Sequence, residues 1–261
     1  MDFTNWSRVI HWLNPTQVSL LFCSEAASQE YQRCQLYPTH VPLSSFQRVL
    51  LSVGSAAMAI TDPRRDGYMV ATFGETTGSK TLVKMHAKMS SSTEGNKILR
   101  DRPRINSESI DLEYLKTLPI NSLGKAYVQF LETNKVTPDS RLPVQFVDDP
   151  ELAYVMQRYR EVHDLYHTVL GMPTNMLGEV AVKWVEALQT SLPMCITAAI
   201  FGPVRFTKRQ RQKYLKHYLP WAINCGMNSK FILNVYFENH WEEDIDELRE
   251  SLHIPVLSLP K

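Results

Sequence analysis

The chain has 261 residues, enough for one large domain with a sizeable core or for two small domains. A formal net charge of +1 argues against a dedicated nucleic-acid-binding protein, so no nucleic-acid partner is expected. No apolar run reaches the roughly 18–20 residues of a membrane-spanning helix, which favours a soluble or peripheral protein. The four cysteines lie far apart, which indicates a reducing compartment and argues against a disulfide framework or a thiolate zinc site: they are Cys23, Cys34, Cys195 and Cys225.

Residues 1–36 differ in character from the rest of the chain. They contain Arg8 and Arg33 but also three acidic residues, whereas a mitochondrial transit peptide is usually rich in arginine and poor in acids. We therefore predict an N-terminal tail over residues 1–36, which is either a targeting segment or disordered.

Helical patterns follow this tail in chain order. A helix is expected over residues 43–60, ended by "DPRRDG", and another over 78–89, where Leu82, Met85 and Met89 recur at spacings of three and four. Shorter helices are expected within 92–106, 107–119 and 121–134, the last capped by Asn121 or Ser122.

The clearest helix start is the stretch "DDPELAYVM". Asp148 or Asp149 is the expected cap, Pro150 takes the first helical position, and the helix should run to about Leu170, before "GMP". Its apolar stripe comprises Leu152, Met156, Tyr159, His163, His167 and Leu170. Both histidines are thus expected on the buried face.

The remaining segments are also helical by pattern. A helix from Thr174 or Asn175 to Ser191 is followed by helices within 207–223 and 240–252. Residues 231–237 read as a possible strand, but one strand alone makes no sheet. The predicted fold is all-α, with a single helical domain over residues 37–261.

The stretch "HDLYHTVLGMPTNMLGEV" carries the chemistry of this chain. His163 and His167 lie one helical turn apart, and Asp164 lies about 100° from the first and 60° from the second. If the next helix packs antiparallel, Glu179 can face them. Two imidazoles and one or two carboxylates suit zinc or ferrous iron.

Each of these residues also has an ordinary structural interpretation. The histidines can be buried and hydrogen-bonded, Asp164 can pair with Arg160, and Glu179 can pair with Lys183 on an exposed face. Burying two histidines and an acid without partners is costly, which favours a metal. The stretch also resembles the HExxH helix of zinc peptidases, but Asp replaces the catalytic Glu and Glu179 follows too soon for that class.

The pattern HDxxH followed after eleven residues by Glu closely resembles the coenzyme Q biosynthesis protein 4 family. Further blocks of that family recur in its order, from about Tyr37 to about Ile254: "GSAAMA", "GETTG", "RPRI", "FVDDPELAYVMQRYREVHD", "LGMPTN", "VKW", "LPMC", "FGP" and "LPWA".

The resemblance implies a mitochondrial protein bound peripherally to the matrix side of the inner membrane. It implies work in ubiquinone biosynthesis with other proteins of that pathway in a multi-subunit complex. It implies a metal, usually zinc, on His163, Asp164, His167 and Glu179. The implied reaction is decarboxylation at C1 of 4-hydroxy-3-methoxy-5-polyprenylbenzoate to 2-methoxy-6-polyprenylphenol.

This reaction can be connected to the candidate residues. A divalent cation stabilises the charge that develops when the carboxylate leaves, and Asp164 is either a fourth ligand or the acid that protonates the ring. Four protein ligands on a tetrahedral zinc would leave no open position. Ferrous iron also suits the ligand set, so an oxidative decarboxylation that uses oxygen stays open.

Two surfaces are candidates for lipid contact. Residues 43–60 and 175–204 are rich in apolar side chains, which either form the core or line a groove for the polyprenyl tail. A basic run either faces solvent or binds anionic lipid; it consists of Arg205, Lys208, Arg209, Arg211, Lys213 and Lys216.

Two other functions compete with the lyase. One is a non-catalytic scaffold that binds a prenyl lipid and organises the biosynthetic complex, with a structural metal. A structural zinc is often thiolate-rich, whereas these ligands are histidines and carboxylates, which favours catalysis. The other is a metal hydrolase of water-soluble substrates.

Overall fold

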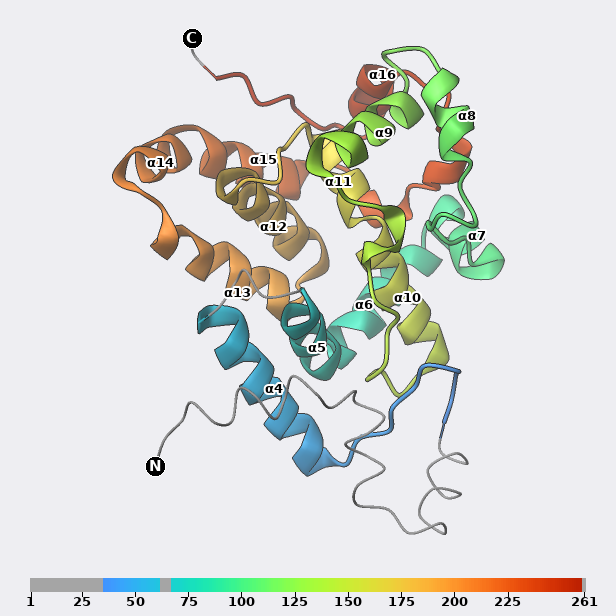
Figure 1. The fold of residues 1–261 in the computed structure, drawn as a ribbon, viewed down its shortest axis with the longest axis vertical. Coiled ribbons are helices and arrows are strands. Elements are labelled where there is room, and N and C mark those ends of the chain that lie inside the picture. Colours follow the sequence, from blue (N-terminus) through green and yellow to red (C-terminus); the bar gives the residue numbers. More distant parts are fainter. Residues whose placement is uncertain (1–34, 62–66, 260–261) are drawn as a thin grey trace.

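The computed structural model describes residues 35–61 and 67–259 (Figure 1). Their helices are α4 (Ser45–Thr61), α5 (Tyr68–Thr77), α6 (Ser79–Ser90), α7 (Thr93–Asp101), α8 (Leu112–Thr117), α9 (Leu123–Asn134), α10 (Pro150–Glu161), α11 (His163–Leu170), α12 (Met176–Thr190), α13 (Pro193–Phe201), α14 (Lys208–Lys213), α15 (Leu219–Asn228) and α16 (Ile245–Ser251). These residues contain no strand, only an isolated bridge between Ser122 and Asp244. The predicted all-α single domain is confirmed.

Two further expectations concern the N-terminal tail and membrane-spanning helices. The tail over residues 1–36 lies outside the described residues, except for Gln35 and Leu36. Among the described helices, none has both the length and the apolar character needed to cross a bilayer.

Side-chain caps fix where the two central helices start. The carboxylate of Asp149 accepts hydrogen bonds from the backbone N–H of Glu151 (2.8 Å) and of Leu152 (3.0 Å), at the start of α10. The side chain of Asn175 accepts from Leu177 and Gly178, both at 3.1 Å, at the start of α12. Both caps satisfy N–H groups that a helix start leaves without intrahelical partners.

The helix predicted to continue to Leu170 is in fact interrupted. α10 ends at Glu161, and α11 begins at His163 after a tight turn at Val162 (φ −84°, ψ −1°). The N–H of Val162 bonds to two carbonyls, those of Arg158 and Arg160. No proline or glycine marks this turn, so it leaves no local signal in the sequence.

Two further differences have physical causes. α5 was not predicted, because its buried residues are small or polar and give no hydrophobic period; they are Thr72, Gly74, Glu75 and Thr76. Residues 231–237 form no strand but 3-10 turns at Ile232–Asn234 and Phe237–Asn239. With no neighbouring strand to pair with, this apolar segment is buried by packing alone.

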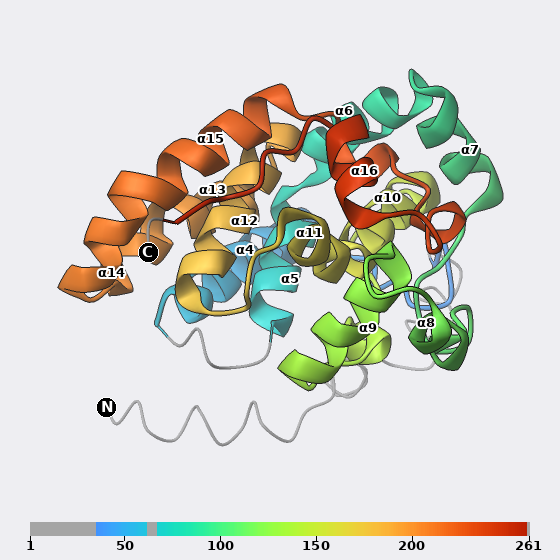
Figure 2. The same cartoon turned by 90° about the horizontal axis from the view of Figure 1, so that it is seen from above.

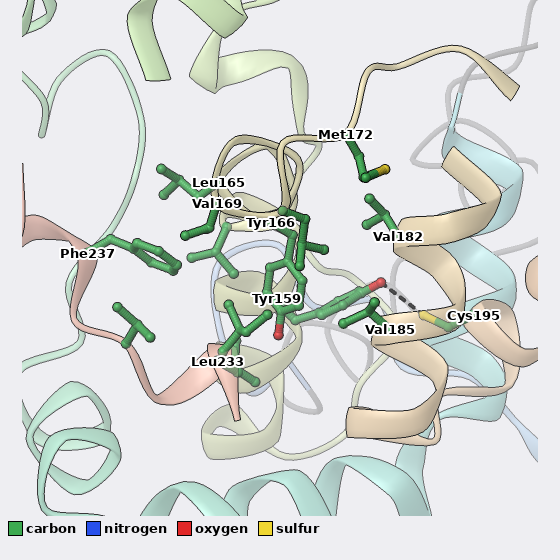
Figure 3. Packing of buried hydrophobic residues seen from close by; sticks show 14 of the residues in the cluster. Tyr159, Leu165, Tyr166, Val169, Met172, Val182, Val185, Cys195, Leu233 and Phe237 are labelled. Atoms are coloured by element: carbon green, nitrogen blue, oxygen red, sulfur yellow. Dashed lines mark hydrogen bonds between the residues drawn. The ribbon is translucent and has the colours of Figure 1, made fainter. Parts of the chain in front are cut away.

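α11 lies at the centre of the core, in contact with α9, α10, α12 and α16 (Figure 2). All of its residues from His163 to Leu170 are buried. Figure 3 shows Leu165, Tyr166 and Val169 packed between α12 and the segment that carries Phe237. Because α11 is buried on every side, its polar side chains need partners inside the protein.

Candidate metal site

Three of the four predicted ligands converge. One donor atom from each of His163 and His167 on α11 and from Glu179 on α12 lie within 4.8 Å of one another. Nε2 of His163 is 3.8 Å from one Glu179 oxygen, and Nε2 of His167 is 3.4 Å from the other. Tetrahedral zinc with bonds of about 2.0–2.1 Å needs donor atoms roughly 3.3–3.5 Å apart, so small side-chain adjustments would suffice.

The other ring nitrogen of each histidine has an acceptor. Nδ1 of His163 lies 2.7 Å from a Glu186 carboxylate oxygen, and Nδ1 of His167 lies 3.0 Å from the Met172 carbonyl oxygen. Both acceptors require a proton on Nδ1, which leaves the Nε2 lone pair for a cation. Metal-binding histidines in proteins typically show this arrangement.

One buried nitrogen supports the metal interpretation directly. Nε2 of His167 has no hydrogen-bond partner within the described residues, although its side chain is only 1 % exposed. An unpaired polar atom at this depth destabilises the fold, and a bound cation would satisfy it. The donor set therefore fits a divalent metal such as zinc or ferrous iron.

The carboxylates of the site favour their charged forms. Burial raises the pKa of Glu179, but the neighbouring imidazoles of His163 and His167 lower it more, and the net pKa lies well below the usual range. Burial likewise raises the pKa of Glu186, which Lys183 and His163 bring well below its ordinary value. Both groups thus favour the negatively charged form, Glu179 toward the predicted metal position and Glu186 toward Lys183 and His163.

Asp164 is not part of the converging group. Its Oδ1 accepts a hydrogen bond of 2.6 Å from Arg141, in a loop that precedes α10. The alternative pairing with Arg160 does not form, since Arg160 bonds to Glu75 on α5 at 2.6 Å. Asp164 is thus adjacent to His163 in the sequence, but in the structure its carboxylate pairs with the guanidinium of Arg141.

Glu186 and Arg141 were not predicted from the sequence. Arg141 lies in a loop, so its contact with Asp164 follows only from the fold. Glu186 had a signal in the sequence: it follows Glu179 by seven residues and therefore lies on nearly the same helix face. Lys183, predicted as a possible partner of Glu179, bonds instead to Glu186 at 2.7 Å.

The sequence can be placed among known proteins. The family model described as "Coenzyme Q (ubiquinone) biosynthesis protein Coq4" matches residues 37–258. The chain belongs to the Coq4 family. This match includes all four predicted ligands, and the family's role is in ubiquinone biosynthesis.

Relatives of this Coq4 family member cover most of its length. It is 54 % identical over 234 residues to the "Ubiquinone biosynthesis protein COQ4 homolog, mitochondrial" of Drosophila yakuba, covering 90 % of this chain and 87 % of that protein. The homologue of Aedes aegypti has the same printed name and is 54 % identical over 219 residues, covering 84 % and 80 %. The Coq4 family assignment therefore applies to nearly the whole chain.

A crystal structure of a protein from Nostoc punctiforme shares the fold of this Coq4 family chain. It superposes with a TM-score of 0.63 at 19 % identity, covering 79 % of this chain and 96 % of that protein. At this identity the likeness concerns the helical architecture.

Proposed function

We propose that this chain is a metal-dependent carboxy-lyase of ubiquinone biosynthesis. Its substrate would be 4-hydroxy-3-methoxy-5-polyprenylbenzoate, and its product 2-methoxy-6-polyprenylphenol. The observation that carries the proposal is the convergence of His163, His167 and Glu179, with both Nδ1 atoms held by acceptors. We prefer zinc as the metal, with ferrous iron as the alternative.

The residues would divide the chemistry as follows. The C1–carboxyl bond breaks to release carbon dioxide, and a proton takes the place of the carboxyl group on C1. The bound metal would supply a Lewis acid that stabilises the negative charge of the reacting group. His163, His167 and Glu179 would hold it and leave a coordination position for substrate.

Asp164 keeps its proposed role as the proton donor. Arg141 engages its Oδ1, so Oδ2 would carry the proton that is delivered to C1. The other proposed role for Asp164, a fourth metal ligand, requires the carboxylate to leave Arg141. Proton delivery from Oδ2 would keep the hydrogen bond from Arg141 to Oδ1.

We further propose that the protein is mitochondrial and binds peripherally to the matrix side of the inner membrane, with other ubiquinone-biosynthesis proteins. The printed names of the relatives include the word mitochondrial. One face of α4 exposes four apolar side chains to solvent: Phe46, Val49, Leu50 and Val53. Such a face suits a lipid surface and a substrate with a polyprenyl tail.

The basic run of residues 205–216 lies after α13. Residues 187–237 contain no Asp or Glu, and exposed basic side chains occur at Lys208, Arg209, Arg211, Lys213 and Lys216. α13 also exposes Ile196, Ile200 and Phe201, and α5 contacts both α13 and α4 (Figure 1). The exposed apolar faces of α4 and α13 thus lie on two helices that both contact α5.

The test of the lyase proposal combines metal analysis with an activity assay. Wild-type protein, Glu179→Gln and the control Glu132→Gln, an exposed glutamate of α9, are purified without chelator. Wild type and control should contain about one zinc or iron per chain and release carbon dioxide from a carboxyl-labelled prenylated hydroxybenzoate. Glu179→Gln should lose most of the metal and at least about 100-fold in rate, since a ligand is missing.

Each other outcome has a distinct meaning. Metal in the wild type without carbon dioxide release would favour the alternative, a non-catalytic prenyl-lipid-binding scaffold with a structural metal. A wild type without metal would refute the metal site. A requirement for oxygen would point to ferrous iron and an oxidative reaction.

A further inference from the structure

Glu186 contacts the predicted ligand His163 through Nδ1, the ring nitrogen not directed at Glu179. It is not one of the four residues of the HDxxH and Glu pattern. Its side chain is fully buried, and three donors lie within 2.8 Å of its carboxylate. His163 Nδ1 lies 2.7 Å from Oε1, while the Tyr159 hydroxyl (2.8 Å) and the Lys183 ammonium (2.7 Å) donate to Oε2. A fully buried carboxylate with this many donors is held in one position.

We propose that Glu186 is a positioning residue, which presents His163 to the metal. The inference rests on the proposed metal site. Because an ionised carboxylate only accepts hydrogen bonds, it fixes the proton of His163 on Nδ1 and turns the Nε2 lone pair toward Glu179. His167 has the same arrangement with a backbone carbonyl as acceptor, so Glu186 is the side-chain counterpart of the Met172 carbonyl.

The surroundings hold Glu186 in turn. Figure 3 shows Tyr159 reaching from α10 across to Cys195 on α13, with the two side chains 3.0 Å apart. Burial raises the pKa of Cys195 to about 12, so its thiol stays protonated and can donate toward Glu186, 3.6 Å away. Lys183 adds a positive charge one helical turn before Glu186. Helices α10, α12 and α13 thus all support one carboxylate.

Glu186→Gln tests the proposal, because an amide offers one acceptor oxygen where three donors meet. Zinc affinity is measured on chelator-stripped protein by competition with a chromogenic chelator. Loss of a hydrogen-bonding partner of a metal ligand typically weakens binding by about 10–100-fold, which is the expected result.

The matched control is Glu75→Gln. Glu75 is also a buried, ion-paired glutamate: it bonds to Arg160 at 2.6 Å and accepts from the backbone N–H of Gln145 and Phe146. It contacts neither histidine in the hydrogen bonds described. This variant should lose stability but keep the wild-type zinc affinity within about twofold, since distant sites act independently.

A second readout separates positioning from a general structural role. In ¹⁵N-histidine spectra of the zinc-bound wild type, the His163 proton should lie on Nδ1, and in Glu186→Gln this resonance should shift or exchange with solvent. If Glu186→Gln does not fold, Tyr159→Phe removes one of the donors that hold the carboxylate and should still weaken zinc binding measurably. Folded Glu186→Gln with wild-type affinity and an unchanged His163 signal would overturn the inference. A wild type that binds no zinc would instead refute the metal site.

Discussion

His240 lies between two glutamates, away from the metal site. Its Nε2 is 3.2 Å from Glu94 on α7, and its Nδ1 bonds to Glu243. The Glu94 bond raises the pKa of His240, burial opposes it, and Glu243 raises it again, so the pKa is about 8 instead of 6.5. A histidine with a raised folded-state pKa stabilises the fold fully below its unfolded value.

This shift predicts a pH-dependent stability. The contribution of His240 should be complete below about pH 6.5 and should disappear as the pH rises through 8. Because His240 is partly exposed, we expect at most about 1 kcal/mol between wild type and His240→Gln at pH 6, and almost none at pH 9.5. Urea unfolding of both proteins at the two pH values measures this. A difference that stays constant with pH would contradict the assignment.

At the residue scale, short-range spacing was enough for part of the site. The four-residue spacing of His163 and His167 on one helix face follows from helix geometry, and the structure places both as predicted. Arg141 contacts Asp164 from 23 residues away, and no spacing rule covers such a contact. The position of Asp164 against Arg141 therefore required the fold.

The start of α12 depends on a glycine. A Cβ on Gly178 would lie 1.9 Å from the Pro173 carbonyl oxygen, so the helix start and the preceding turn can approach this closely only without a side chain. Glu179 is the next residue. The contact between turn and helix therefore fixes where this ligand enters the site.

Gly178→Ala is expected to lower the free energy of unfolding by about 1–3 kcal/mol and to weaken metal binding, because the turn or the helix must shift. The control is Gly54→Ala on α4, where an added Cβ meets nothing within 4 Å. In a helix interior this change should be neutral or stabilising by up to about 1 kcal/mol. Denaturant unfolding of both variants checks the pair, and equal effects would show that the close approach at Gly178 carries no strain.

At the element scale, prediction was best where caps and apolar periods agree, as at Asp149 and Asn175. It failed where a local irregularity interrupts a helical pattern. The segment 207–223 was predicted as one helix, but a π-helical turn over Tyr214–Tyr218 separates α14 from α15. Pro220, near the start of α15, lacks the N–H that a continuous α-helix needs, which accounts for the local change of hydrogen bonding.

At the scale of the whole molecule, the exposed apolar face of α4 predicts membrane binding. Phe46 is 76 % exposed and Val53 is 65 % exposed, on a helix without acidic residues. Vesicle co-sedimentation should show binding that increases with anionic lipid and decreases with salt, since each basic residue near the surface contributes roughly 1 kcal/mol. The double variant Phe46→Asp, Val53→Asp should reduce the bound fraction several-fold.

Ile120→Asp serves as the control. Ile120 is 70 % exposed but lies between α8 and α9, outside the α4 face. The Ile120→Asp variant should bind vesicles as the wild type does. If Ile120→Asp weakens binding as much as the α4 variant, the interaction is a general effect of added negative charge and not of this face.

Nε2 of His167 lacks a hydrogen-bond partner in the part of the chain that the structure describes, and this has a consequence for the cell. The three donor atoms come from α11 and α12, so they meet only after these helices have packed, and a newly made chain must first fold around an unsatisfied nitrogen. A ligand at about 100 times its dissociation constant adds about 2.7 kcal/mol of stability and thereby reduces the unfolded fraction exposed to proteases about 100-fold. The proposed metal site therefore predicts that the abundance of this protein follows the supply of the metal, so that scarcity would act through degradation as well as through lost activity.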